Sequence, residues 1–115
     1  MTQTDVIDAL TQVLAARRDA DPAKSYVASL YAAGTDQILK KVAEEAAEVL
    51  LAAKNLKDAS RNDALIGEVA DLWFHTLVML IHLNQEPRWV FDELQRRFGV
   101  SGHAEKAGRT TSQNG

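Results

Sequence analysis

Two segments with helical periodicity, each carrying a pair of acids, constrain the fold more than any other feature of the sequence. Their apolar positions recur every three or four residues: Leu39, Val42, Ala46, Val49, Leu50 and Ala53 in the first segment, and Leu65, Val69, Leu72, Trp73, Thr76, Leu77 and Leu80 in the second. The acid pairs are Glu45 with Glu48 and Glu68 with Asp71. Side chains at i and i+3 lie on neighbouring parts of one helix face. If the two apolar stripes pack together, we expect both acidic flanks to face one cleft.

Four carboxylates in one cleft repel each other unless a cation lies among them. Oxygen ligands suit Mg²⁺ or Mn²⁺ better than zinc, and Mg²⁺ held by a few carboxylates usually meets substrate phosphates. The pattern therefore predicts a Mg²⁺ site with four ligands: Glu45, Glu48, Glu68 and Asp71. The alternative is a solvated acidic face, since such charges are common on exposed helices. A di-iron site is disfavoured because the Glu-x-x-His pattern of ferritin-like sites does not occur at these acids.

The composition indicates one soluble, all-α domain. The chain has 115 residues, 46% of them hydrophobic and 25% charged, and alanine and leucine favour helices. A net charge of −3 gives no broad attraction to nucleic acid or membranes. The absence of cysteine excludes disulfides and thiolate sites. The N-terminus does not have the pattern of a signal peptide, and the apolar stretch 72–83 is too short to span a bilayer. We therefore expect a cytoplasmic protein.

Helix signals divide the chain into five helices joined by short connections. We predict helices over about 5–18, 23–33, 36–55, 61–83 and 87–98. Thr4 and Thr35 are predicted N-caps, and Ser60 with Asp63 resembles a capping box. Gly34 and Gly99 are predicted helix stops, and Pro87 a helix start. Residues 1–99 then form a single domain, and 100–115 a mobile polar tail.

Several polar residues near the acids have both a functional and a structural interpretation. His75 shares the flank of Glu68 and could orient a carboxylate, contact a substrate or sit hydrogen-bonded at the core edge. Lys41 and Lys54 could bind phosphates or serve as solvated charges along the helix. Arg96 and Arg97, near the end of the last helix, have the same two interpretations. Glycine-rich phosphate loops do not occur in the sequence, so phosphate binding would depend on metal and lysines.

The sequence resembles the phosphoribosyl-ATP pyrophosphatases, members of the all-α, MazG-like NTP pyrophosphatases. The superfamily pattern is Glu-x-x-Glu, a spacer and Glu-x-x-Asp, and here residues 49–67 form the spacer. The resemblance extends over about 20–98. It is carried by Ser25-Tyr26, Leu30, Gly34, Ile38-Leu39-Lys40-Lys41-Val42, Glu44-Glu45-Ala46-Ala47-Glu48-Val49, Ala52-Ala53-Lys54-Asn55, Glu68-Val69-Ala70-Asp71-Leu72, His75 and Leu77-Val78.

The resemblance implies a MazG-like helical bundle and hydrolysis of phosphoribosyl-ATP at its α–β phosphoanhydride. The products are phosphoribosyl-AMP and pyrophosphate, in the second step of histidine biosynthesis. One of the four predicted metal ligands, or Glu44, would orient or deprotonate the attacking water. Predicted substrate contacts are Lys41, Lys54, Asn55 and His75. The alternatives are a general NTP or dNTP pyrophosphatase and a non-enzymatic helical interaction module.

The long helices also carry more apolar surface than three short helices can cover. We therefore predict a homodimer whose helices pack across a two-fold axis, with the site near that interface.

Overall fold

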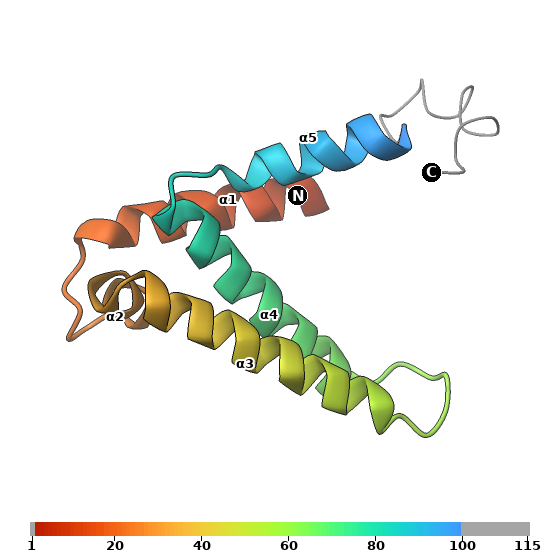
Figure 1. The fold of residues 1–115 in the computed structure, drawn as a ribbon. Coiled ribbons are helices and arrows are strands. Elements are labelled where there is room, and N and C mark those ends of the chain that lie inside the picture. The colour runs from red at the N-terminus through yellow and green to blue at the C-terminus, as the bar shows by residue number, and fades with distance from the viewer. Residues whose placement is uncertain (1, 100–115) are drawn as a thin grey trace.

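Two 20-residue helices form an antiparallel hairpin at the centre of the fold: α3 (Thr35–Lys54) and α4 (Asp63–His82). In this computed structural model, which describes residues 2–99, they lie side by side along most of their length (Figure 1). The other elements are α1 (Gln3–Ala16), the short 3-10 helix η1 (Arg17–Asp19), α2 (Tyr26–Ala33) and α5 (Pro87–Phe98). The described part of the chain contains helices and no strand, so the predicted all-α fold with a long-helix hairpin is confirmed.

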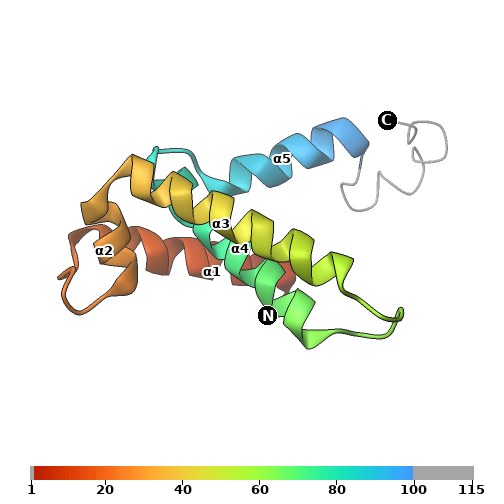
Figure 2. The same ribbon diagram turned by 60° about the horizontal axis from the view of Figure 1, so that its bottom comes forward.

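The hydrophobic core lies at one end of the hairpin, where α1 and α2 cover it. It consists of Leu14, Val27, Leu30, Ile38, Leu77, Val78 and Ile81. These residues come from the end of α1, from α2, from the first turn of α3 and from the second half of α4. Both ribbon views place the α3–α4 connection at the opposite end of the hairpin from α2 (Figures 1 and 2). The core therefore stabilises only the α2 end of the hairpin.

Arg18 ties the end of the first helical segment to the end of α4. Its guanidinium donates hydrogen bonds to the backbone carbonyl of Ile81 and to Asn84. A cation at this position also suits the negative end of the α4 dipole. The contact joins elements more than 60 residues apart in the sequence and helps to close the core.

Two helix starts differ from the sequence prediction because other residues cap them. Helix α2 begins at Tyr26 instead of about residue 23, since the Ser25 hydroxyl accepts a hydrogen bond from the Ala28 amide at 3.2 Å. Thr35 is not a cap: Gly34 holds that position, and the Thr35 hydroxyl lies 3.1 Å from Nε2 of His82. The threonine thus links α3 to α4.

The start of α4 was also predicted incorrectly. Asn62 is the N-cap, and its side-chain oxygen accepts from the Leu65 amide at 2.9 Å. Ser60 instead bonds the Asp58 carboxylate within the connection. In α1, Thr4 lies inside the first turn and not at the cap. The predicted helix start at Pro87 and the predicted helix ends at Gly34 and Gly99 are confirmed. Gly99 lies in the left-handed backbone region.

Two glycines provide a matched stability test. Gly34 has φ 100° and ψ 177°, a conformation that side chains strongly disfavour, whereas Gly67 lies inside α4 with open space around its Cα. We expect Gly34→Ala to lower the free energy of unfolding by about 1–3 kcal/mol. Gly67→Ala is expected to raise it by up to about 1 kcal/mol. Urea denaturation of both variants checks this, and loss of stability in Gly67→Ala would contradict the open environment.

The described chain is elongated, with extents of 51 × 36 × 27 Å and a radius of gyration of 16.9 Å. A compact domain of this length has a radius of gyration of about 13 Å.

Helix α4 is long and apolar enough to cross a membrane by length and composition, a test that core helices of soluble proteins also pass. Here α4 packs against α3 and contributes Leu77, Val78 and Ile81 to the core.

Candidate active site

Three acids from the two hairpin helices meet at one place. A carboxylate oxygen from each of Glu45, Glu68 and Asp71 lies within 4.8 Å of the others. Glu45 comes from α3 and is partly buried, while α4 supplies the partly buried Glu68 and the exposed Asp71. The hairpin therefore brings both predicted acidic flanks to one side, as the packing of the apolar stripes requires.

The acids interact electrostatically. The pKa of Glu68 is raised above its usual value, first by desolvation and then by the negative charges of Glu48, Asp71 and Glu45. Glu48 lies outside the close trio, but its charge acts on Glu68 more strongly than that of either of the other two acids. Partial burial and mutual repulsion both penalise the charged acids, and a cation would remove this penalty. The all-oxygen donor set fits a hard divalent cation such as Mg²⁺.

A lysine lies at the edge of the acids. Lys41 is one turn before Glu45 on α3, and its ammonium is 3.5 Å from the Glu44 carboxylate. The pKa of Lys41 is raised above its usual value, first by the electrostatic interaction with Tyr26 and then by Glu44 and Glu45. Among the predicted substrate contacts, Lys41 thus lies beside both the acids and another polar side chain. Glu44 itself is exposed and does not belong to the trio.

Lys54 and Asn55 are further from the acids. Both are exposed at the end of α3, where Asn55 is the C-cap. Lys54 follows Glu48 by six residues, which corresponds to about 9 Å along the helix axis. Their predicted contact with substrate therefore requires a ligand that extends along α3 toward the hairpin connection.

His75 is buried and hydrogen-bonded through both ring nitrogens. Its Nδ1 lies 2.9 Å from the backbone carbonyl of Asp71, and its Nε2 lies 2.8 Å from the hydroxyl of Tyr26. A carbonyl only accepts, so in the neutral imidazole Nδ1 carries the proton and Nε2 accepts from the tyrosine. Sequence analysis did not predict this contact of Tyr26, because a contact across 49 residues leaves no local pattern.

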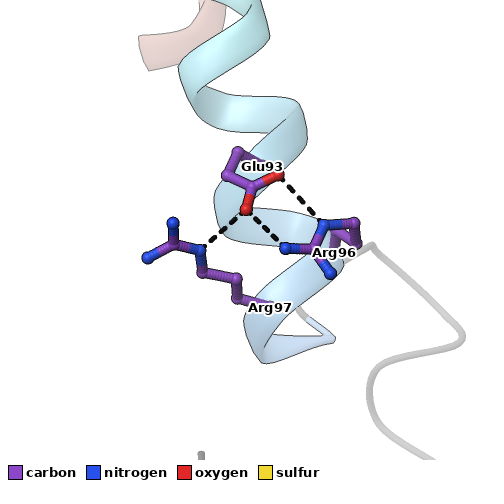
Figure 3. Close-up of polar contacts among 3 residues, drawn as sticks. All are labelled: Glu93, Arg96 and Arg97. Carbon is purple, nitrogen blue, oxygen red and sulfur yellow. Dashed lines mark hydrogen bonds and ion pairs between the residues drawn. The ribbon is translucent and has the colours of Figure 1, made fainter.

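The two arginines at the end of α5 are engaged with an acid of the same helix. Arg96 and Arg97 both donate to Glu93, with Nε–oxygen distances of 3.0 and 2.8 Å (Figure 3). The hydrogen bonds from Arg96 and then Arg97 lower the pKa of Glu93 to about 2. This arrangement supports the helix-end interpretation of the arginines over a role in phosphate binding.

An all-helical chain with acids facing each other across a long hairpin has the architecture of the MazG-like pyrophosphatases. The family model described as phosphoribosyl-ATP pyrophosphohydrolase matches residues 7–98. The chain is also 52% identical over 106 residues to a phosphoribosyl-ATP pyrophosphatase of Hydrogenovibrio crunogenus, covering 92% of this chain and 94% of the relative. The chain therefore belongs to the phosphoribosyl-ATP pyrophosphohydrolase family.

Proposed function

We propose that this protein hydrolyses phosphoribosyl-ATP to phosphoribosyl-AMP and pyrophosphate in histidine biosynthesis, with a divalent cation at the hairpin acids. Its family membership supports the reaction. We assign the reaction to the hairpin acids because carboxylate oxygens of Glu45, Glu68 and Asp71 lie within 4.8 Å of one another. The substrate is a soluble nucleotide, so we place the enzyme in the cytoplasm.

The acids and the lysines would have different roles in the reaction. Glu45, Glu48, Glu68 and Asp71 would hold Mg²⁺ or Mn²⁺ through carboxylate oxygens. The bound cation would neutralise charge on the triphosphate and on the leaving pyrophosphate. Lys41 would pair with a phosphate oxygen as a point charge, and Lys54 with Asn55 could extend this contact along α3. A carboxylate of this set, or the exposed Glu44, would orient the attacking water and accept its proton.

The direct experiment measures pyrophosphate release from phosphoribosyl-ATP beside a panel of NTPs and dNTPs, with Mg²⁺ and with chelator. We expect metal-dependent turnover of phosphoribosyl-ATP. Equal turnover of ordinary nucleotides would instead identify a general nucleotide pyrophosphatase with the same acids. Absence of turnover by the folded protein would support a non-catalytic helical module.

We also propose that two copies of the chain pack together. An apolar groove of about 480 Å³ lies among α1, α4 and α5, and its lining includes Leu72 and Trp73, the two residues that follow Asp71. Trp73 is 63% exposed in the single chain, and Leu50 on α3 is 69% exposed. Burial of such surface in a second copy would complete the elongated fold close to the acids.

Sedimentation at micromolar concentration tests the dimer. We expect a dimer of the full chain whose activity falls on dilution into the monomer range. A fully active monomer at that concentration would contradict the proposal.

A further inference from the structure

The hydroxyl of Tyr26 has a fixed hydrogen-bonding role. In the neutral imidazole of His75, Nδ1 donates to the Asp71 carbonyl and Nε2 therefore accepts the proton of this hydroxyl. The phenolic oxygen therefore keeps lone pairs that only accept. His75 is 6% exposed and packs edge-on against the rings of Tyr26 and Phe74, so the imidazole is held in place. Tyr26 itself is 53% exposed.

This acceptor lies beside the candidate active site. One imidazole ring separates the Tyr26 oxygen from the backbone of Asp71, a member of the acidic trio. The pKa of Lys41 is raised first by its electrostatic interaction with Tyr26, which indicates that the two side chains are neighbours. Lys41 in turn interacts with Glu44 and Glu45. An acceptor, a cation and a group of acids thus lie in one region of the hairpin.

The chemistry of the acceptor indicates which part of a nucleotide it would meet. Phosphate oxygens also accept and carry negative charge, so a phenolic oxygen without a free proton does not bind them. A sugar hydroxyl can donate. The ribose joined to the α-phosphate is the hydroxyl-bearing group next to a phosphate chain held by Lys41 and the acids.

We propose that Tyr26, held by His75, contacts the substrate by accepting a hydrogen bond from a hydroxyl of the ribose that carries the triphosphate. His75 acts as a positioning residue through Tyr26. The inference rests on the proposed function and adds a ribose contact to its site. It also explains why a histidine with both nitrogens engaged lies one turn after a predicted metal ligand.

The test compares Tyr26→Phe with the wild-type enzyme on phosphoribosyl-ATP. The variant keeps the ring and loses the oxygen. We expect KM to rise about tenfold, the cost of one hydrogen bond to substrate, with kcat within twofold. Tyr31→Phe is the matched control, since the Tyr31 hydroxyl donates to the Leu14 carbonyl at 2.9 Å in the core. An unchanged KM in Tyr26→Phe, or the same rise in Tyr31→Phe, would overturn the proposal.

A second measurement tests the contact between Tyr26 and the ribose hydroxyl directly. ATP, 2′-deoxy-ATP and 3′-deoxy-ATP are compared as Mg²⁺-dependent ligands by calorimetry, which needs no turnover. The wild type should bind one deoxy analogue about tenfold more weakly than ATP, and Tyr26→Phe should bind that analogue and ATP equally. Equal binding of all three by the wild type, or unchanged discrimination in the variant, would overturn the ribose assignment. Failure of the proposed function would instead appear as a wild type without metal-dependent turnover.

Discussion

Asp71→Asn is expected to lower kcat for phosphoribosyl-ATP by about 10²–10³-fold, the largest effect that we predict for one substitution. Asparagine has nearly the same shape but lacks the negative charge that would help to hold a divalent cation beside Glu45 and Glu68. The loss corresponds to about 3–4 kcal/mol of transition-state stabilisation, which is typical for one electrostatic element of an active site. Steady-state kinetics at saturating Mg²⁺ gives the value.

Asp63→Asn is the control for Asp71→Asn. Asp63 lies on the same helix, is exposed, and pairs with Arg61 at 2.8 Å, away from the trio. Its replacement removes the same charge from α4 and should leave kcat within twofold. If both variants lost activity equally, the effect would come from the net charge of α4 and the metal assignment of Asp71 would be wrong.

Magnesium is expected to raise the melting temperature by about 10–20 °C at a hundredfold excess over its Kd. Binding to the folded state alone contributes about 2.7 kcal/mol at that concentration, and each kcal/mol shifts the melting temperature of a domain of this size by roughly 4–8 °C. Calorimetric scans with Mg²⁺ and with chelator measure the shift. A shift below 2 °C at millimolar Mg²⁺ would contradict a preformed site.

The Glu48→Gln variant tests whether the rise in melting temperature with Mg²⁺ depends on the acids. The negative charge of Glu48 helps to raise the pKa of Glu68, so its removal relieves repulsion in the metal-free protein. We expect the variant to melt higher than the wild type with chelator and to lose most of its response to Mg²⁺. A full Mg²⁺ response in Glu48→Gln would limit the metal site to Glu45, Glu68 and Asp71.

The sequence predicts the fold well because strong periodicity decides it. The stripes on α3 and α4 account for the hairpin, and the i, i+3 spacing of the acids accounts for their convergence. Helix starts were less predictable because several polar residues competed to cap each one. Asn62 caps α4 in place of Ser60, and Ser25 caps α2, which begins three residues beyond the expected start. Helix propensity does not decide which of these neighbouring polar residues becomes the N-cap. The path of the connecting segment decides it.

Tyr26 shows the other limit of sequence-based prediction. Its bond to His75 depends on how α2 packs against the hairpin, and no spacing along the chain encodes that contact. The acids were found because they repeat within single helices. The roles of Glu44, Lys54 and Asn55 remain predictions, since their exposed positions are compatible with several contacts.

Because the core lies at one end of the hairpin, we expect the other end of the hairpin to unfold locally more readily. The core residues of α3 and α4 all lie toward α2, while the acids lie near the middle of the hairpin, between the core and the connection. Amide protons around residues 49–70 should therefore exchange with solvent through local separation of the two helix ends, at a lower free energy than global unfolding. A cation bridging α3 and α4 would hold the two helices together and raise the free energy of this local separation. Catalysis and local order would then depend on the same four carboxylates.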